Sequence, residues 1–335
     1  MIRWFLFSGL IVASIILGIA YRDYHQFLNH PSENDQAVVF EVMQGDSLGV
    51  VSSRLQEAGL INNNRWFKLL AFKSKAEASI KTGVYSIQPA TTPVTILSTL
   101  VAGRVNQYSI TFVEGWSFKQ LLQVLGKNVH IKQTITGMSY DAIMSRLGYP
   151  GQHPEGRFFP ETYFFINNTS DLDILKRAYE KMQKNLTEEW ENRDRKLPLK
   201  TPYEALILAS IIEKETGRAG ERAEIAGVFI RRLRKNMLLQ TDPTVIYGMG
   251  ERYKGNIRRK DLRTDTPYNT YTRFGLPPTP IAMPGQAALH AAVHPKQGDT
   301  LFFVAKGNGS HIFSATLKQH NQAVNQYQKK QRVKQ

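Results

Sequence analysis

One glutamate in a very apolar helix is the residue of this chain best suited to acid–base chemistry. The segment Leu206–Thr216 reads LILASIIEKET, and the eight residues before Glu213 are all apolar except Ser210. A helix with apolar residues on nearly every side is expected to be buried. At 100° per residue, Glu204 and Glu215 fall on the opposite side of the helix from Glu213, and we expect them to reach water.

The position of Glu213 predicts a specific protonation behaviour. Partial burial disfavours the carboxylate, so its pKa should be raised and the acid should be protonated part of the time near neutral pH. A general acid needs this property. The alternative is that Glu213 pairs with an Arg or Lys and serves only to complete the helix.

Length, composition and charge restrict the class of protein. The chain has 335 residues, enough for two soluble domains and an appendage, and its 42% hydrophobic content is typical of a folded protein. The formal net charge of +15 favours acidic partners such as phospholipid headgroups, nucleic acid or an anionic polymer. Since cysteine is absent from the sequence, disulfides and thiol catalysis are excluded.

The N-terminal segment predicts a membrane anchor over residues 1–22. The run Trp4–Ala20 has no charged residue and carries aromatic residues near its ends, as in a short membrane-spanning helix with its N-terminus inside. A cleaved signal peptide is the alternative, with Gly18 and Ala20 at suitable spacing for cleavage. Both interpretations place the rest of the chain outside the cytoplasm, so we expect no nucleic-acid partner.

After a linker at residues 23–37, a small module is predicted over residues 38–106. The pattern is a strand at Val38–Val42, a Gly45-Asp46-Ser47 turn, two helices and a strand at Gly83–Ile87. This order resembles a LysM module, a small fold that holds N-acetylated glycans. A packing module without sugar contacts is an equally good interpretation.

The rest of the chain, residues 107–335, is predicted to be a mixed α+β catalytic domain in which 107–150 is a connecting subregion. Long helices are expected from Asp171 to about Trp190 and over Glu221–Arg234. A hairpin is expected with strands Leu301–Ala305 and His311–Ser314.

Four segments rich in Pro, Gly, aromatic or polar residues lack the periodicity of a helix or strand, and we expect them to be loops. They are Glu155–Tyr163, Leu239–Thr244, Pro267–Tyr271 and Gly275–Pro278. Amide groups beside flat rings suit carbohydrate recognition. Each segment taken singly is also consistent with a structural turn.

A series of motifs in fixed order resembles one known family. The motifs are EGRFFPETY from Glu155, ASIIEKET from Ala209, GVFIRRL from Gly227, LQTDPTVIYGMG from Leu239, YNTY from Tyr268, GLPPTPI from Gly275, and His294-Pro295. Together they resemble the YceG-like family of endolytic murein transglycosylases. The resemblance extends from the anchor to the C-terminal helix. It implies a membrane-anchored enzyme that cuts nascent peptidoglycan strands internally and leaves 1,6-anhydro-N-acetylmuramic acid ends.

The resemblance assigns the catalytic acid to Glu213 and the LysM-like region to about residues 38–103. It also implies a place in the inner membrane, with the C-terminal domain in the periplasm, and a link to peptidoglycan synthases. Two positions differ from the usual family pattern, Arg231 in place of Asn and Thr279 in place of Gly. These differences concern loop shape and substrate contacts more than the reaction.

A single carboxyl group is sufficient for this chemistry. Glu213 would protonate the glycosidic oxygen and then accept the proton of the sugar's own C6 hydroxyl. Hydrolysis normally requires two carboxyl groups, and Glu161 would supply the second if it lay across a cleft from Glu213, making the protein a muramidase. The candidates for substrate contacts are Gln240, Asp242, Tyr268, Asn269 and Glu161. Asp242 could instead cap a helix that begins near Pro243.

Other chemistries have weaker support. His290 and His294 have an i, i+4 spacing that can bind zinc, but no H-E-x-x-H general base accompanies them. We therefore expect no metal and interpret both as capping or hydrogen-bonded histidines. No nucleotide-binding glycine pattern follows a predicted strand, so we expect no cofactor. The alternative from another functional class is a non-catalytic scaffold that binds peptidoglycan.

Overall fold

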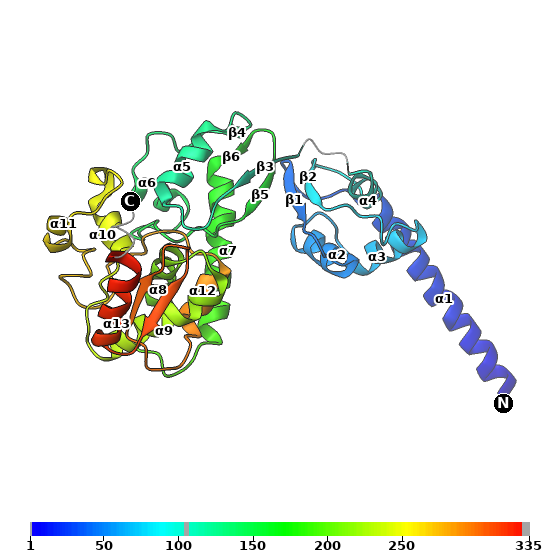
Figure 1. The fold of residues 1–335 in the computed structure, drawn as a ribbon. Helices are drawn as coiled ribbons and strands as arrows, with labels where there is room; N and C mark the ends of the chain where they lie inside the picture. The colour runs from blue at the N-terminus through cyan, green and yellow to red at the C-terminus, as the bar shows by residue number, and fades with distance from the viewer. Residues whose placement is uncertain (1, 104–106, 330–335) are drawn as a thin grey trace. The chain divides into compact units, whose positions relative to one another are not determined.

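The structure is a computed structural model that describes residues 2–103 and 107–329, without the side chains of residues 2–13, 107 and 329. It confirms a mixed α+β fold (Figure 1). The chain forms two compact units, one extending to Ser109 and including Phe164–Thr169, the other made of Ile110–Tyr163 and Ser170–Gln335. The domain limits predicted above remain predictions.

The first unit packs four helices and a two-stranded sheet around one core. Its elements are α1 (Ile2–Asn29), β1 (Val38–Val42), α2 (Leu48–Glu57), α3 (Asn64–Lys73), β2 (Gly83–Ile87) and α4 (Pro93–Ala102). Strands β1 and β2 are antiparallel, with Val38 opposite Ile87. Phe40 and Val42 are buried whereas Val39 is exposed, the alternation expected of a strand covered on one face.

Helix α1 continues beyond the predicted anchor because its last turns pack on this unit. Tyr24 and Phe27 are buried in the core with Leu55 and Phe67. Most of the predicted anchor, residues 1–13, lies outside the described side chains. Among the described residues, we find no helix that combines the length and the apolar character needed to cross a membrane.

The second unit contains most of the helices. These are α5 (Phe118–Lys127), α6 (Tyr140–Arg146), α7 (Asp171–Glu191), α8 (Pro202–Glu215), α9 (Arg222–Arg234), α10 (Asp242–Met249), α11 (Arg259–Arg263), α12 (Gln286–Val293) and α13 (Leu317–Val324), with short turns η1 (Ala219–Glu221), η2 (Gly250–Arg252) and η3 (Asn325–Lys329). Strand β3 (Gln107–Thr111) pairs with β5 (Thr162–Ile166), β4 (Ile131–Lys132) with β6 (Thr169–Ser170), and β7 (Phe302–Ala305) with β8 (His311–Ser314).

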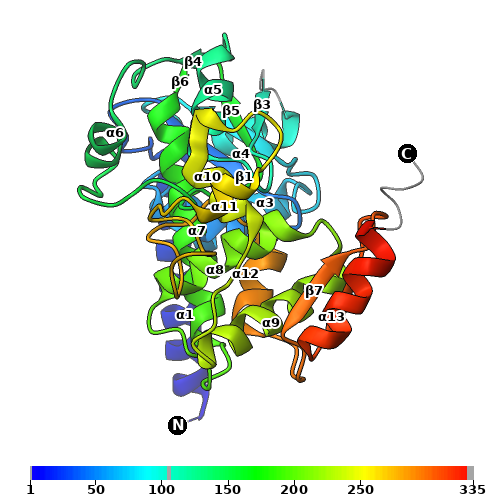
Figure 2. The ribbon, with the colours of Figure 1, turned by 60° about the vertical axis from the view of Figure 1, so that its left-hand side comes forward.

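Helix α8 is the centre of this unit, surrounded by α7, α9, α10 and α12 (Figure 2). All residues from Ala205 to Ile212 are buried, which confirms the expected buried helix. Even Ser210 is satisfied internally, since its hydroxyl donates to the Ile207 carbonyl and accepts from the Ile281 N–H. The helix therefore has little freedom to move, and its last turn holds Glu213 in a fixed place.

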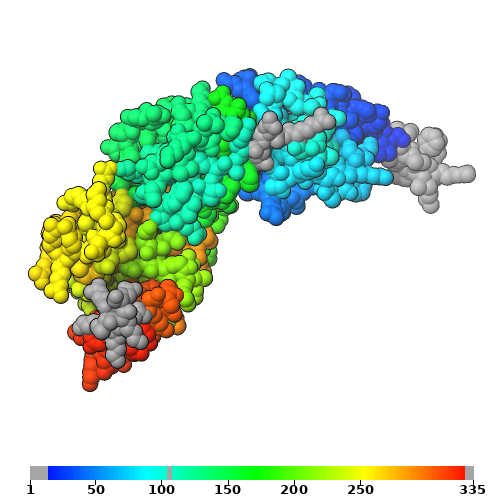
Figure 3. Space-filling view, turned by 45° about the horizontal axis from the view of Figure 1, so that its top comes forward, coloured from blue at the N-terminus to red at the C-terminus, as the bar shows by residue number. Residues whose placement is uncertain are grey.

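The predicted loop at Leu239–Thr244 is wrong in its second half, because α10 begins at Asp242. Pro243 fits the first turn of this helix, where its missing N–H has no helical partner to lose. Beyond α10, residues 250–265 form the yellow surface region in Figure 3. An ion pair between Lys119 of α5 and Glu251 of η2 joins this region to the N-terminal part of the unit.

Candidate active site

Glu213 lies in the last turn of α8 with few partners. Its side chain is 6% exposed. The Gly285 N–H donates a 3.1 Å hydrogen bond to its Oε2, and Nη2 of Arg222 lies 3.7 Å from its Oε1. The first contact is an ordinary hydrogen bond, and the second is an ion pair whose separation is longer than a hydrogen bond.

Burial raises the pKa of Glu213 above its usual value. The Gly285 N–H and the Arg222 guanidinium oppose this effect, whereas the negative charge of Glu114 adds to it. Because the net shift of the pKa is upward, desolvation outweighs the Gly285 N–H and the Arg222 guanidinium. The acid therefore holds its proton to a higher pH than an exposed glutamate. This is the behaviour expected of a general acid, while the contact with Arg222 is the pairing that the structural interpretation expects.

A second carboxylate, Glu114, lies beside Glu213 and was missed by the sequence analysis. A Cβ atom added at Gly285 would lie 1.8 Å from Oε1 of Glu114, so this carboxylate occupies the space that the absent side chain leaves. Glu114 is exposed. The one sequence feature that could have indicated it is its place in Glu114-Gly115-Trp116, shortly before α5 begins at Phe118. The two carboxyl groups thus lie on either side of Gly285, one buried and one open to water.

Backbone contacts hold the Glu114 loop against the acid. The Gly115 N–H donates to the Met283 carbonyl at 2.9 Å, and the Met283 N–H donates to the Trp116 carbonyl at 2.8 Å. Lys214 Nζ donates to the Gly115 carbonyl at 3.1 Å. At Gly115, where φ is +78°, a Cβ atom would lie 4.0 Å from Cγ of Glu213. The loop and the segment before α12 therefore enclose Glu213 together.

Glu155, from the EGRFFPETY motif, holds the residues that follow the same loop. Its carboxyl group is buried and accepts from the Phe118 N–H at 2.9 Å and from the Tyr247 hydroxyl at 3.0 Å. Burial raises its pKa to about 7. Gly156 approaches the next loop so closely that a Cβ atom would lie 2.4 Å from Cβ of Pro280. The motif therefore anchors both segments that surround Glu213.

The predicted substrate contacts lie in different surroundings. Tyr268 is half-buried, and its ring meets that of Tyr247 edge-on at 4.9 Å while its hydroxyl bonds to Thr279. Asn269 is fully buried, and its amide donates to three carbonyls at the end of α11, of which the nearest is that of the C-cap residue Thr264 at 2.7 Å. These are the contacts of a residue that stabilises its own loop.

The other three predicted contacts are exposed or paired with protein groups. Gln240 is exposed and has a left-handed backbone, with φ of +51°. Asp242 is the first residue of α10 and accepts from the Tyr271 hydroxyl at 2.6 Å. Glu161 forms an ion pair with Lys181 of α7. In the described part of the chain, the carboxylate whose charge raises the pKa of Glu213 is Glu114.

Glu215, expected to face water, is instead largely shielded. Its carboxyl group accepts from the Thr241 hydroxyl, and burial raises its pKa to about 7. The helical wheel placed it correctly opposite Glu213, but the segment leading into α10 covers that side of α8. The helix thus carries two desolvated glutamates, of which only Glu213 lies beside Glu114.

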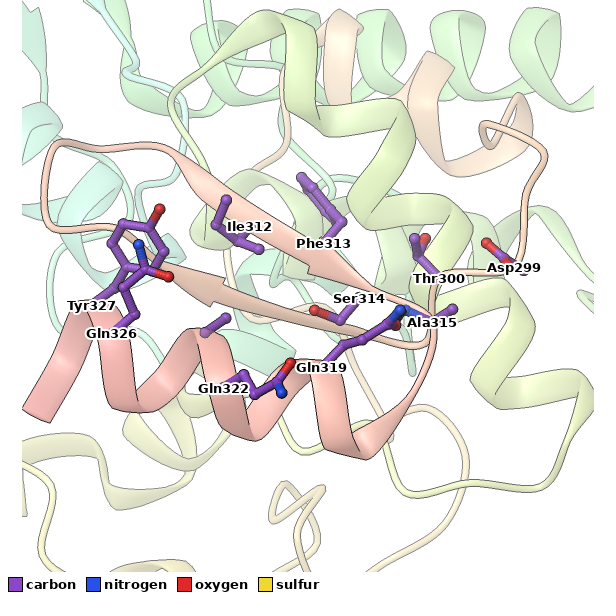
Figure 4. Close-up of a pocket in the computed structure, with 11 residues that line it drawn as sticks. Asp299, Thr300, Ile312, Phe313, Ser314, Ala315, Gln319, Gln322, Gln326 and Tyr327 are labelled. Atoms are coloured by element: carbon purple, nitrogen blue, oxygen red, sulfur yellow. Dashed lines mark hydrogen bonds between the residues drawn. The ribbon is translucent and has the colours of Figure 1, made fainter.

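A separate polar pocket of about 520 Å³ lies between the β7–β8 hairpin and the helix that follows it (Figure 4). Gln319, Gln322 and Gln326 line one side, and Tyr327 closes one end. Amides beside an aromatic ring suit a sugar or peptide. Glu213 is not among the lining residues, so this pocket is distinct from the buried acid.

Fold and site together define a class: an α+β enzyme in which a desolvated glutamic acid, Glu213, lies beside an exposed carboxylate, Glu114. The sequence matches the YceG-like family over residues 40–326, and the chain belongs to that family. It is 32% identical over 332 residues to the endolytic murein transglycosylase of Bacillus subtilis. The aligned region covers 93% of this chain and 91% of the relative.

Two further relatives agree. The endolytic murein transglycosylase of Streptococcus pneumoniae is 24% identical over 351 residues, covering 94% of this chain and 63% of the relative. The crystal structure of a YceG-like protein from Listeria monocytogenes is 27% identical, with a TM-score of 0.53 over 86% of this chain and 99% of that chain. The match to a solved member of the family supports the fold of the units described above.

Proposed function

We propose that this protein is a peptidoglycan lytic transglycosylase that cuts glycan strands internally, between N-acetylmuramic acid and N-acetylglucosamine. The names of the Bacillus and Streptococcus relatives support a murein substrate and endolytic cutting. The observation that carries the proposal is Glu213, a glutamic acid with a raised pKa beside an exposed carboxylate and one backbone N–H.

The proposed reaction needs no water. The protonated Glu213 donates its proton to the glycosidic oxygen as the bond from that oxygen to the anomeric carbon breaks, and the departing sugar leaves as an alcohol. Positive charge then develops at the ring. The C6 hydroxyl of the same muramic acid attacks the anomeric carbon and returns its proton to the Glu213 carboxylate. A 1,6-anhydro ring forms, and the enzyme is restored.

Two protein groups near the acid support this sequence of steps. The Gly285 N–H holds Oε2 of Glu213, and proton transfer would use Oε1, which lies 3.7 Å from Nη2 of Arg222. The nearby negative charge of Glu114 raises the proton affinity of Glu213 and would stabilise the oxocarbenium-like charge. Both effects favour the acid form before cleavage and the cationic sugar during it.

Glu114 also supports a second candidate function, a hydrolytic muramidase. Glycosidases that use water normally have two carboxyl groups at the scissile bond, and Glu114 and Glu213 could supply them. The end of the product distinguishes the two reactions, because lytic cleavage gives an anhydro end and hydrolysis gives a reducing end. A scaffold that only binds glycan would give neither product.

Glu213→Gln tests the enzyme directly. Glutamine keeps the acceptor for the Gly285 N–H but has no proton to donate, so turnover of purified uncrosslinked glycan should fall about 10²–10⁴-fold while strand binding remains. Glu188→Gln is the matched control, because Glu188 is an exposed glutamate of α7 whose nearest cation is Lys184 at 3.9 Å. Activity of Glu213→Gln equal to that of the control would reject an acid role for Glu213, and absence of turnover by the wild type would leave the scaffold.

The remaining parts of the proposal concern location. We place residues 1–22 in the inner membrane with the N-terminus inside, and the other residues in the periplasm near peptidoglycan synthases. The uncharged run Trp4–Ala20 and the net charge of +15, suited to anionic lipid headgroups and stem peptides, support this arrangement. The unit with β1 and β2 would hold glycan in the manner of a LysM module. Protease digestion of spheroplasts tests the topology, and protection of the C-terminal domain would contradict it.

A further inference from the structure

Helix α12 carries two histidines that meet a glutamate from another helix. Oε2 of Glu189, in the last turns of α7, lies 3.0 Å from Nδ1 of His290 and 3.9 Å from Nε2 of His294. All three ligand atoms lie within 4.8 Å of one another, and the two imidazole rings are 4.4 Å apart. The sequence offered only the histidine pair. The third group comes from a residue about a hundred positions earlier in the chain.

We infer that Glu189, His290 and His294 form a zinc-binding site that joins α7 to α12. Two imidazoles and a carboxylate are a common set of protein ligands for zinc. Tetrahedral zinc, with bonds of about 2.0–2.2 Å, keeps its ligand atoms roughly 3.4 Å apart. The distances from Oε2 of Glu189 to the two histidine nitrogens, 3.0 and 3.9 Å, fall on either side of that spacing. Small side-chain rotations therefore suffice to form the site.

The exposure of the three groups fits metal entry. The side chain of His290 is 61% exposed and that of His294 is 33% exposed, whereas Glu189 is 14% exposed. The histidines can thus adjust to an ion arriving from solvent, and the carboxylate is already held in place. Three protein ligands leave a fourth position for water, so no further side chain is needed.

An outer contact orients the carboxylate. The amide of Gln286, one turn before His290, donates to Oε1 of Glu189 at 2.7 Å and leaves Oε2 facing the histidines. Metal-binding carboxylates usually have such a partner. A separate backbone bond, from the Asp194 N–H to the Val293 carbonyl at 3.1 Å, fixes the ends of α7 and α12 relative to each other. The ligands are therefore held by packed elements.

A bound ion would have a structural effect near the candidate acid. Gly285 caps α12 and donates to Glu213, so a zinc ion that fixes α12 against α7 also fixes that donor. The effect expected from this geometry is stabilisation of the folded chain by zinc, because the folded state binds the ion and the unfolded chain does not present the site. The inference stands whether or not the enzyme proposal holds.

Titration of the purified full chain, stripped with EDTA, against zinc chloride tests the inference. We expect about one zinc per chain, a rise in Tm, and visible absorption typical of tetrahedral coordination when Co²⁺ is the probe. His290→Ala, His294→Ala and Glu189→Gln should each weaken binding by more than tenfold, and Gln286→Ala by about tenfold.

His311→Gln is the matched control. His311 also contacts a carboxylate, Glu221, at 2.7 Å, so loss of binding in this variant would mean that zinc binds at that pair and would overturn the site. Equal Tm values in EDTA show that the variants fold. Absence of zinc binding by the wild type, or binding unchanged in all of the ligand variants, would also overturn the inference. Gln286→Ala keeps all three ligands, so its result does not depend on the folding of a ligand variant.

Discussion

The charge of Glu114 should control the pH range in which Glu213 acts. Glu114 raises the pKa of Glu213, so Glu114→Gln should lower it and leave less of the acid protonated near neutral pH. In water-like surroundings, which suit an exposed carboxylate, two unit charges a few ångströms apart interact by about 1 kcal/mol. We therefore expect kcat/KM near neutral pH to fall about fivefold.

Gly285→Ala provides a steric version of the same change. The added Cβ would lie 1.8 Å from Oε1 of Glu114, and ordinary contact begins at 3.4 Å, so the carboxylate must move by about 1.6 Å. Gly285 has φ of −80°, which alanine adopts without strain, and its N–H remains available to Glu213. The variant should displace the charge of Glu114 without removing it, and its effect should be smaller than that of Glu114→Gln.

The assay is the pH dependence of kcat/KM on purified glycan strands, which reports on groups of the free enzyme. In both variants the alkaline limb should move to lower pH, and Glu188→Gln should leave it unchanged. An alkaline limb that stays in place or moves to higher pH in Glu114→Gln would refute the reasoning that the two carboxyl groups interact.

Three other substitutions give distinct outcomes. Arg222→Met removes a cation that lowers the pKa of Glu213, so the alkaline limb should move to higher pH, and movement to lower pH would contradict the account. Glu215 has a folded pKa of about 7 against an ordinary 4.5, so its stabilising contribution is present below pH 4.5 and is lost as pH rises through 7. Glu215→Gln should therefore be more stable than wild type above pH 7, by about 3 kcal/mol in chemical denaturation, and the difference should disappear near pH 4. Asn269→Ala leaves three carbonyls at the end of α11 without this donor and should reduce the free energy of unfolding by about 1–3 kcal/mol; an unchanged value would show that water replaces the amide.

Local pattern predicted most of the secondary structure. The strands Val38–Val42 and Gly83–Ile87 have the predicted limits, and the helix at Asp171–Glu191 ends one residue from its expected end. Alternation and helical spacing are properties of neighbouring residues, and they can be read without knowing the fold. The burial of α8 followed for the same reason, because its apolar residues cover every side.

The surroundings of Glu213 could not be predicted in the same way. Its hydrogen bond to Gly285 spans 72 positions, and Glu114 lies still farther away in the chain. Such contacts depend on how helices pack, which single-sequence periodicity does not encode. The prediction that Glu215 reaches water was wrong for a related reason. The helical wheel gave the direction of its side chain but could not show that residues near Thr241 cover that side of α8.

Product analysis in H₂¹⁸O tests the central claim most directly. If Glu213 accepts the proton of the sugar's own C6 hydroxyl as that hydroxyl attacks, mass spectrometry of wild-type products will show 1,6-anhydro ends without ¹⁸O, and Glu213→Gln will form almost none. Reducing ends that carry ¹⁸O would contradict the account, because they would mean that water attacks the anomeric carbon and that the two carboxyl groups perform hydrolysis.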